Sequence, residues 1–239
     1  MPNIHETWTV LPHSPLREID DGILTVTGEV HLPLVDLERR MSVVRLKEGS
    51  SVIYSAIALG DAEMKRIEAF GTPRYLVVPG DAHRLDAKIF KLRYPNIQVI
   101  TPPGAAKRVA KVVPVDAAGV DFGDRDVSWH VVSGVGGHEA ALLVRRSSGT
   151  TLILSDLIGN LRRKAGFEGW MLHIMGFGNY RPQIPAVEKM LMVRSTEQLR
   201  RQLLEWASIA DLKRIIMSHG EPIDAGPADA LQALAATLN

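Results

Sequence analysis

The sequence predicts a layered α/β fold in which an antiparallel sheet comes first and helices join it later. Short runs rich in β-branched residues, separated by polar turns, dominate the first sixty residues. Segments with helical spacing then alternate with short apolar runs. This order favours a layered mixture over a purely doubly wound parallel sheet. The 239 residues contain no linker, repeat or low-complexity tract, so we expect a single domain over residues 1–239.

The composition excludes several classes of protein. Hydrophobic content of 46% and charged content of 23% are ordinary for a globular chain. Because 28 Lys and Arg residues face 27 Asp and Glu residues, nothing indicates a nucleic acid or an anionic membrane as partner. Without cysteine, any metal must be held by His, Asp or Glu. No apolar run reaches the roughly 18 residues of a membrane span, and the N-terminus lacks signal-peptide features, so we expect a cytoplasmic protein.

The opening strands are indicated by β-branched residues and by the turn between two of them. The three predicted strands cover residues 22–30, 41–46 and 51–59. The sequence KEGS at 47–50 is typical of a hairpin turn, which predicts that the sheet begins antiparallel.

An alternation of helices and strands follows. Residues 60–70 have apolar positions near helical spacing, with Asp61 as the expected N-cap, and 74–80 form a buried strand. The same criteria predict helices at 84–94 and 104–111, and strands at 97–101, 127–132, 139–146 and 151–156.

The last third begins with an irregular segment, residues 157–185, in which Gly, aromatic, Met and basic residues show no sustained period. Such a segment is either a lid or a packed irregular insertion. As a lid it would use four apolar side chains as pocket walls, namely Trp170, Met171, Phe177 and Tyr180.

Three further elements complete the chain. Residues 195–209 form an amphipathic helix that Ser195 or Thr196 can cap. Residues 212–223 read as a strand that ends in a His-Gly loop. The closing helix, at 226–238, has Pro227 near its first turn.

Acidic and imidazole side chains gather where predicted strands end. The loop after the strand at 74–80 carries Asp81, His83 and Asp86. Other strand boundaries carry His138, Asp156 and His219. Because a sheet delivers strand-end residues to a shared rim, these side chains can converge although they are far apart in the sequence. Carboxylate and imidazole are suitable ligands for divalent zinc, iron or manganese.

The order of these features resembles the metallo-β-lactamase superfamily. Opening hairpins precede a ligand loop, a Gly-rich loop, a strand-ending Asp and a Ser-His-Gly loop before the last helix. The stretches RMSVVRLKEGSSVIYSAIAL, HRLDAKIFKLRYP and SDLIGN are similar to a divergent branch of that superfamily. The resemblance implies a four-layer αββα sandwich with its site at one edge of the two sheets. It also implies one or two metal ions, commonly zinc and sometimes iron, that activate water for hydrolysis.

The ligand loop departs from the His-x-His-x-Asp-His motif of the superfamily. Asp81 stands in place of the first His, Leu85 replaces the Asp, and Asp86 replaces the last His. The remaining positions keep the family's residue types, namely His83, His138, Asp156 and His219. Leu85 can neither bind a second metal nor orient water. Asp86 is either a ligand or the cap of the following helix, and Glu139 offers an alternative register for His138.

Two classes of function follow. The first is a metal-dependent hydrolase of a small ester, lactone, thioester or phosphoester that binds at most one ion tightly. One ligand set would be Asp81, His83 and His138 with Asp156 shared, and the other would be Asp86, Asp156 and His219. The second class is a non-catalytic or metal-free descendant that binds a small molecule or a protein partner in the old cleft.

Overall fold

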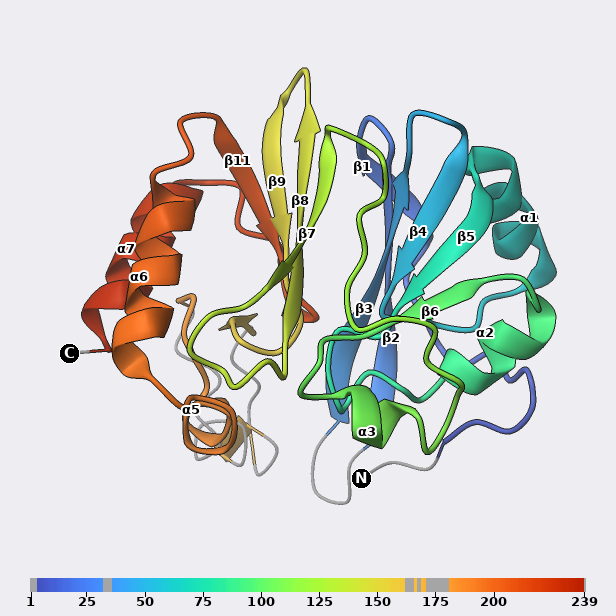
Figure 1. The fold of residues 1–239 in the computed structure, drawn as a ribbon, viewed down its shortest axis with the longest axis horizontal. Helices are drawn as coiled ribbons and strands as arrows, with labels where there is room; N and C mark the ends of the chain where they lie inside the picture. Colours follow the sequence, from blue (N-terminus) through green and yellow to red (C-terminus); the bar gives the residue numbers. More distant parts are fainter. Residues whose placement is uncertain (1–3, 32–35, 162–165, 167–168, 171–180, 239) are drawn as a thin grey trace.

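Two β-sheets pack face to face and carry helices on their outer surfaces (Figure 1). The computed structural model describes residues 4–31, 36–161, 166, 169–170 and 181–238. This four-layer arrangement confirms the αββα sandwich. None of the helices within these ranges is long and apolar enough to cross a membrane.

The first sheet has six strands in chain order, β1 to β6. Their bounds are Arg17–Asp20, Ile23–His31, Asp36–Arg45, Ser50–Tyr54, Thr72–Val77 and Gln98–Ile100. The strands from β1 to β4 are antiparallel, whereas β5 and β6 continue the sheet in parallel with β4. The antiparallel opening and the turn at 47–50 are therefore confirmed.

The second sheet has the strand order β11-β9-β8-β7. Its strands are β7 (Val127–Val131), β8 (Ala140–Arg146), β9 (Gly149–Ile153) and β11 (Leu212–Ile216). A short parallel pair, β10 (Gly159–Asn160) and β12 (His219–Gly220), lies beside it. Gly220 has φ +94°, and a Cβ atom there would lie 2.1 Å from the carbonyl oxygen of Asn160. Only glycine fits this position.

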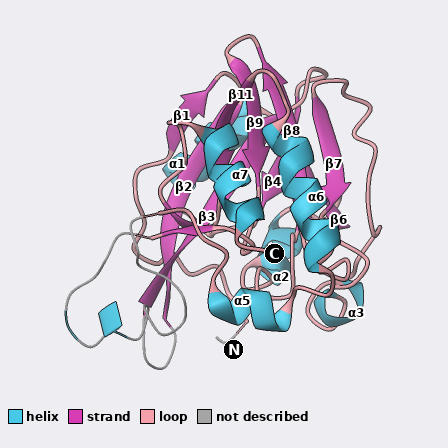
Figure 2. Cartoon of the chain, turned by 90° about the vertical axis from the view of Figure 1, so that its left-hand side faces the viewer, coloured by secondary structure: helices cyan, strands magenta, loops and turns pink. Residues whose placement is uncertain are grey.

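Helices cover both outer faces. They are α1 (Asp61–Phe70), α2 (Ala87–Arg93), α3 (Ala106–Val109), α5 (Ala186–Leu191), α6 (Thr196–Ala207) and α7 (Pro227–Ala236). Figure 2 shows α6 and α7 side by side over the second sheet. Ser195 caps α6 by accepting the backbone N–H of Gln198, which confirms the expected cap. The expected Asp61 cap is wrong, because Asp61 is already inside α1 and Gly60 holds the N-cap position.

Three apolar layers separate the four structural layers. Side chains such as Val44 and Leu142 fill the space between the two sheets. A second cluster, which includes Phe90, lies between the first sheet and its helices. A third, which includes Trp206, lies between the second sheet and α6 and α7. This packing fixes the two sheets relative to each other and so fixes the edge at which their strands end.

Several predicted strands are shorter in the structure because the chain turns at their ends. The run predicted at 51–59 stops at Tyr54, and Ser55 has φ +58°, which an extended strand cannot accommodate. The run predicted at 151–156 stops at Ile153, and the one predicted at 212–223 stops at Ile216. The chain thereby releases polar residues from the sheet at these points.

The segment predicted as a lid is only partly described. Its first residues, Leu157 and Ile158, are fully buried in the core beneath α6 and α7. Trp170 is 57% exposed. Met171, Phe177 and Tyr180 lie outside the described residues, so the lid itself stays a prediction.

Candidate functional site

The strand ends meet at one edge of the sandwich. β9 and β11 run parallel in one sheet, and β4 and β5 run parallel in the other, so their carboxyl ends lie at the same side of each sheet. Because β8 is antiparallel to β9, the residues that precede β8 reach this edge as well. The topology thus gathers residues 55, 80–86, 138–139, 155–156 and 218–219.

His83, Asp156 and His219 form one cluster. The Nε2 atom of His83 lies 2.8 Å from Oδ1 of Asp156, and the Nε2 atom of His219 lies 3.1 Å from the same oxygen. His83 and Asp156 are buried, with exposed fractions of 9% and 8%. Residues more than sixty positions apart in the sequence are therefore in direct contact.

The other ring nitrogen of each histidine is held by the protein. The Nδ1 atom of His83 lies 2.8 Å from Oγ of Ser55. The Nδ1 atom of His219 lies 2.5 Å from the backbone carbonyl oxygen of Glu38. Since a carbonyl oxygen only accepts hydrogen bonds, Nδ1 of His219 carries a proton. In the neutral ring, Nε2 then presents a lone pair to the carboxylate, so a proton or another cation is needed between them.

The charges in this cluster support each other. Burial alone would raise the pKa of Asp156, but His83 and His219 lower it well below its ordinary value. Burial likewise opposes the charged form of His219, but the hydrogen bond and charge of Asp156 raise the net pKa of the imidazole. Burial and the negative charge of Asp156 raise the pKa of Glu188, on α5, to about 7. The ionised carboxylate of Asp156 therefore attracts cations to this cluster.

Glu139 braces the loop that carries Asp156. Its carboxylate accepts the backbone N–H of Ser155 at 2.9 Å and that of Leu157 at 3.0 Å. Glu139 is fully buried, and burial together with the charge of Asp156 raises its pKa to about 8. It therefore fixes the backbone on both sides of Asp156 and does not take the ligand position considered for His138.

Ser55 adopts a strained backbone conformation. Among the described residues it is the one non-glycine residue with positive φ. Its N–H donates to the carbonyl oxygen of Val77, and its hydroxyl reaches His83. Strain of this kind costs about 1–3 kcal/mol and persists where the surroundings fix the residue, often at functional sites.

Asp81 and His138 form a second group beside the cluster. Nδ1 of His138 lies 3.5 Å from Oδ2 of Asp81, and Nη1 of Arg108 lies 2.5 Å from the same oxygen. The first predicted ligand set, Asp81, His83 and His138 with Asp156 shared, is divided between two contacts. His83 lies against Asp156, and His138 lies against Asp81, whose charge Arg108 neutralises.

Asp86 is fully buried and belongs to a third group. One carboxylate oxygen pairs with the guanidinium of Arg39, and the other lies 2.6 Å from Nδ1 of His5. The capping role is wrong, because Asp86 occupies the N-cap position of α2 without a side-chain bond to the helix. Leu85 beside it is buried and apolar. Both oxygens of Asp86 are thus engaged by basic side chains.

The donor types in the cluster suit a metal ion. Two imidazole nitrogens and a carboxylate oxygen are ligands that zinc, iron and manganese accept. Metal-binding histidines also commonly donate their second N–H to a carbonyl or similar acceptor, as His219 does to Glu38. In the geometry of the described residues, however, no three His, Asp or Glu side chains are placed to hold an ion together. The nitrogens approach Asp156 itself.

Several residues of this edge are not predicted by the sequence pattern. Ser55 falls within the strand predicted at 51–59, and Glu188 lies in a helix that the pattern does not predict. His219 contacts the backbone carbonyl of Glu38, so the type of side chain at position 38 does not predict this contact. Glu139 directly precedes the apolar run AALLV, which indicates that its carboxyl group is buried. The sequence does not indicate which groups it bonds.

Comparison with solved structures identifies the fold. The DIM-1 metallo-β-lactamase is 13% identical, with a TM-score of 0.64 over 97% of this chain and 100% of that one. FIM-1 from Pseudomonas aeruginosa, in a mono-zinc form, is 14% identical, with a TM-score of 0.61 over 95% and 96%. A metallo-β-lactamase from Pontibacter korlensis is 11% identical, with a TM-score of 0.62 over 93% and 98%. Neither a family model nor a curated protein matches the sequence. The chain therefore has the metallo-β-lactamase fold.

Proposed function

We propose that this protein is a hydrolase that holds one divalent metal ion between His83, Asp156 and His219. The substrate class is a small ester, lactone, thioester or phosphoester. Zinc, iron and manganese all accept this combination of nitrogen and oxygen donors.

The observation that carries the proposal is the shared direction of the two imidazole rings. Both Nε2 atoms face Oδ1 of Asp156, while both Nδ1 atoms are anchored by protein oxygens. Because the Nδ1 atoms are anchored, both Nε2 atoms point toward Asp156, where a cation would bind. A cation beside Asp156 would also satisfy the lone pair that neutral His219 presents to the carboxylate.

The residues around the proposed ion would have separate roles in binding and orientation. A bound divalent ion supplies a Lewis acid and lowers the pKa of a coordinated water. Asp156 contributes the negative charge that attracts the ion, and Glu139 keeps the backbone on both sides of Asp156 in place. Ser55 and the Glu38 carbonyl set the orientation of the two imidazole rings.

The buried pair of Arg39 and Asp86 supports a single ion. Asp86 stands where the resemblance places a metal ligand, yet its carboxylate already binds a guanidinium and an imidazole. Leu85 contributes no donor atom. A second ion at this end would have to displace Arg39, whose positive charge is permanent.

A hydrolysis screen tests the proposal. The purified protein is assayed on a panel of activated esters, lactones, thioesters and phosphoesters, first after chelation and then with each of zinc, iron(II) and manganese. We expect hydrolysis of at least one class that requires metal and is lost in His219→Ala. The matched control is His130→Ala, which alters a histidine on β7 outside the site. No metal-dependent hydrolysis of any class, or equal activity in both variants, would contradict the proposal.

A second candidate is a metal-free descendant that binds a small molecule or a protein partner. It is favoured by one observation, namely that the donors contact each other and not a common central point. In that case His219 would be an imidazolium paired with Asp156. Measuring the ring nitrogen chemical shifts of His219 before and after metal addition separates the two candidates. A shift from the protonated to the metal-bound signal supports the hydrolase, and no change supports the descendant.

A further inference from the structure

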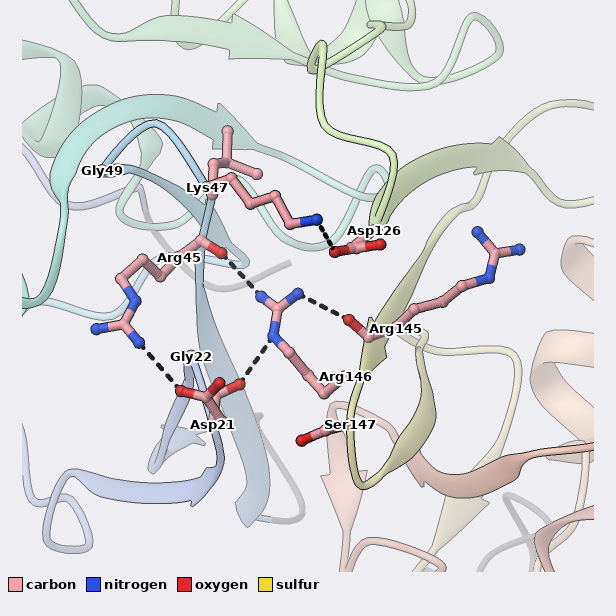
Figure 3. A pocket seen from close by; sticks show the side chains of 10 residues that line it. Asp21, Gly22, Arg45, Lys47, Gly49, Asp126, Arg145, Arg146 and Ser147 are labelled. Carbon is pink, nitrogen blue, oxygen red and sulfur yellow. Dashed lines mark hydrogen bonds and ion pairs between the residues drawn. The ribbon is translucent and has the colours of Figure 1, made fainter.

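A pocket lies at the edge of the sandwich opposite the His83 cluster. Figure 3 shows the side chains that line this cavity of about 570 Å³. They come from the β1–β2 turn, the β3–β4 turn, the β8–β9 turn and the loop before β7. β8 joins the two edges, since its seven residues run from beside Glu139 to Arg146. At about 3.4 Å per residue, that strand separates the pocket from the His83 cluster by about 20 Å.

The pocket carries an excess of positive charge. Four of its lining residues are cationic and two are carboxylates, namely Arg45, Lys47, Arg145 and Arg146 against Asp21 and Asp126. Arg45 pairs with Asp21 at 3.0 Å, and Lys47 pairs with Asp126 at 2.5 Å. In the described part of the chain, Arg145 and Arg146 bond backbone carbonyls and no carboxylate. The Arg145 side chain points away from the other lining side chains (Figure 3), so among the described residues the guanidinium of Arg146 is the charge inside the pocket that no carboxylate pairs with.

Arg146 is held rigidly. Its Nε atom donates to the carbonyl of Asp21 at 2.9 Å, Nη1 to that of Arg145 at 2.9 Å, and Nη2 to that of Arg45 at 2.8 Å. The turn approaches the guanidinium so closely that a Cβ atom on Gly22, whose φ is +67°, would lie 3.1 Å from Nη2. Glycine at this position allows the arginine to rest against the turn.

The guanidinium keeps donors for a ligand. An arginine has five N–H donors, and three of those on Arg146 are used by carbonyls. One N–H on each terminal nitrogen remains. This planar fork matches two oxygens of a carboxylate or phosphate, and its orientation is already fixed before a ligand arrives.

We propose that this pocket binds a small molecule carrying at least two negative charges on phosphate or carboxylate groups. Arg146 provides the oriented donors, and Arg45 and Lys47 at the rim add charge. The volume falls in the range of small-molecule sites and exceeds the needs of one inorganic ion. The pocket lies at the far edge from the His83 cluster, so the inference does not depend on the proposed hydrolase activity.

The surroundings of Asp126 are consistent with this charge. The Lys47 hydrogen bond lowers the pKa of Asp126, and the positive charges of Lys47, Arg146 and Arg125 act in the same direction. An added anion would therefore meet a local excess of positive charge and not a balanced surface.

The test uses pyrophosphate and citrate as probes on the full-length, metal-free protein at low ionic strength. Isothermal titration calorimetry measures affinity, and backbone amide NMR shifts locate the site. We expect saturable 1:1 binding of at least one probe, with shifts at Gly22, Gly49 and Ser147. Arg146→Gln should weaken binding by about tenfold or more, because it removes a charge-assisted bidentate contact.

Two further variants keep the result interpretable. The Lys47 side chain is exposed and pairs with Asp126, and Lys47→Gln should also weaken probe binding. This variant tests the pocket even if Arg146→Gln fails to fold. Arg200→Gln removes the same charge from exposed α6 and should leave affinity unchanged. The inference is overturned if neither probe binds saturably or if Arg200→Gln weakens binding as much as the pocket variants. Shifts centred on Asp156 and His219 would also overturn it.

Discussion

The Nδ1 atom of His219 lies 2.5 Å from the backbone carbonyl oxygen of Glu38, so the opposite nitrogen of the ring faces Asp156. Glu38 is on β3 and His219 follows β11, so this contact ties the two sheets together at the site. It places a proton on Nδ1 and directs Nε2 toward Asp156, where the proposed ion would bind.

Replacing Ser55 should weaken metal binding through His83. Ser55→Ala removes the oxygen that anchors Nδ1 of His83, and loss of such a partner costs about 10–100-fold in metal affinity. Ser55→Gly loses the same oxygen but tolerates φ +58°, so it should be more stable than Ser55→Ala by about 1 kcal/mol. Zinc competition titrations and urea unfolding measure the two effects. Equal stability of the two variants would contradict the strain, and unchanged affinity would contradict the anchoring.

Breaking the Arg39–Asp86 pair should destabilise the fold without removing the ion. Arg39→Met leaves a buried carboxylate with only His5 as partner, and loss of one member of a buried ion pair costs about 3–5 kcal/mol. The double variant Arg39→Met with Asp86→Leu should recover much of that loss. Chemical denaturation of the four proteins in this cycle gives the coupling free energy. A double variant as unstable as Arg39→Met would show that the pair is not isolated from the rest of the core.

Glu139 should make the stability of the metal-free protein depend on pH. Its pKa is about 8 in the folded state against an ordinary 4.5, so the folded protein binds the extra proton. The free energy of unfolding should therefore fall as pH rises from about 4.5 to 8, by at most about 1.4 kcal/mol per pH unit. Urea unfolding in the presence of a chelator measures it.

Glu139→Gln is the control for that pH dependence. The amide cannot ionise, so the component of the slope that belongs to this carboxyl should disappear between pH 5 and 8. A slope identical to that of the unchanged protein would show that Glu139 is ionised in the folded state.

His138 should be dispensable for metal binding. Its ring lies beside Asp81, which Arg108 neutralises, and in the described part of the chain its ion pair is with Asp81 and not with Asp156. His138→Ala should retain its metal, whereas His83→Ala should lose it. Elemental analysis after dialysis against the same buffer compares the two. Loss of metal from His138→Ala would restore the ligand set built on Asp81, His83 and His138.

The sequence was sufficient for the architecture because strand and helix periodicities survive in it. The antiparallel opening, the cap at Ser195 and the position of Pro227 at the start of α7 are all confirmed. Strand ends were harder to predict. Apolar residues continue past Tyr54 and Ile153, and only the backbone turn at Ser55 and the Glu139 bonds to Ser155 and Leu157 show where the strands stop.

The sequence predicts which residues gather at the site but not which side chains bond each other there. His83, Asp156 and His219 were singled out from strand-end placement, and the structure brings them together. Asp86 was placed at the site by its position in a motif. The deciding interaction is with Arg39, a strand residue 47 positions earlier, and no periodicity connects the two. Long-range charge pairs of this kind depend on tertiary packing.

The central claim is that one ion binds at Asp156, and metal stoichiometry tests it most directly. Protein purified without chelator and supplied with zinc, iron(II) or manganese is dialysed and analysed for metal per chain, beside Asp156→Ala and Asp86→Ala. Because Asp86 is bound by Arg39 and His5, we expect close to one equivalent in the unchanged protein and in Asp86→Ala, and none in Asp156→Ala. Two equivalents in the unchanged protein, or an Asp156→Ala variant that keeps its metal, would contradict the account.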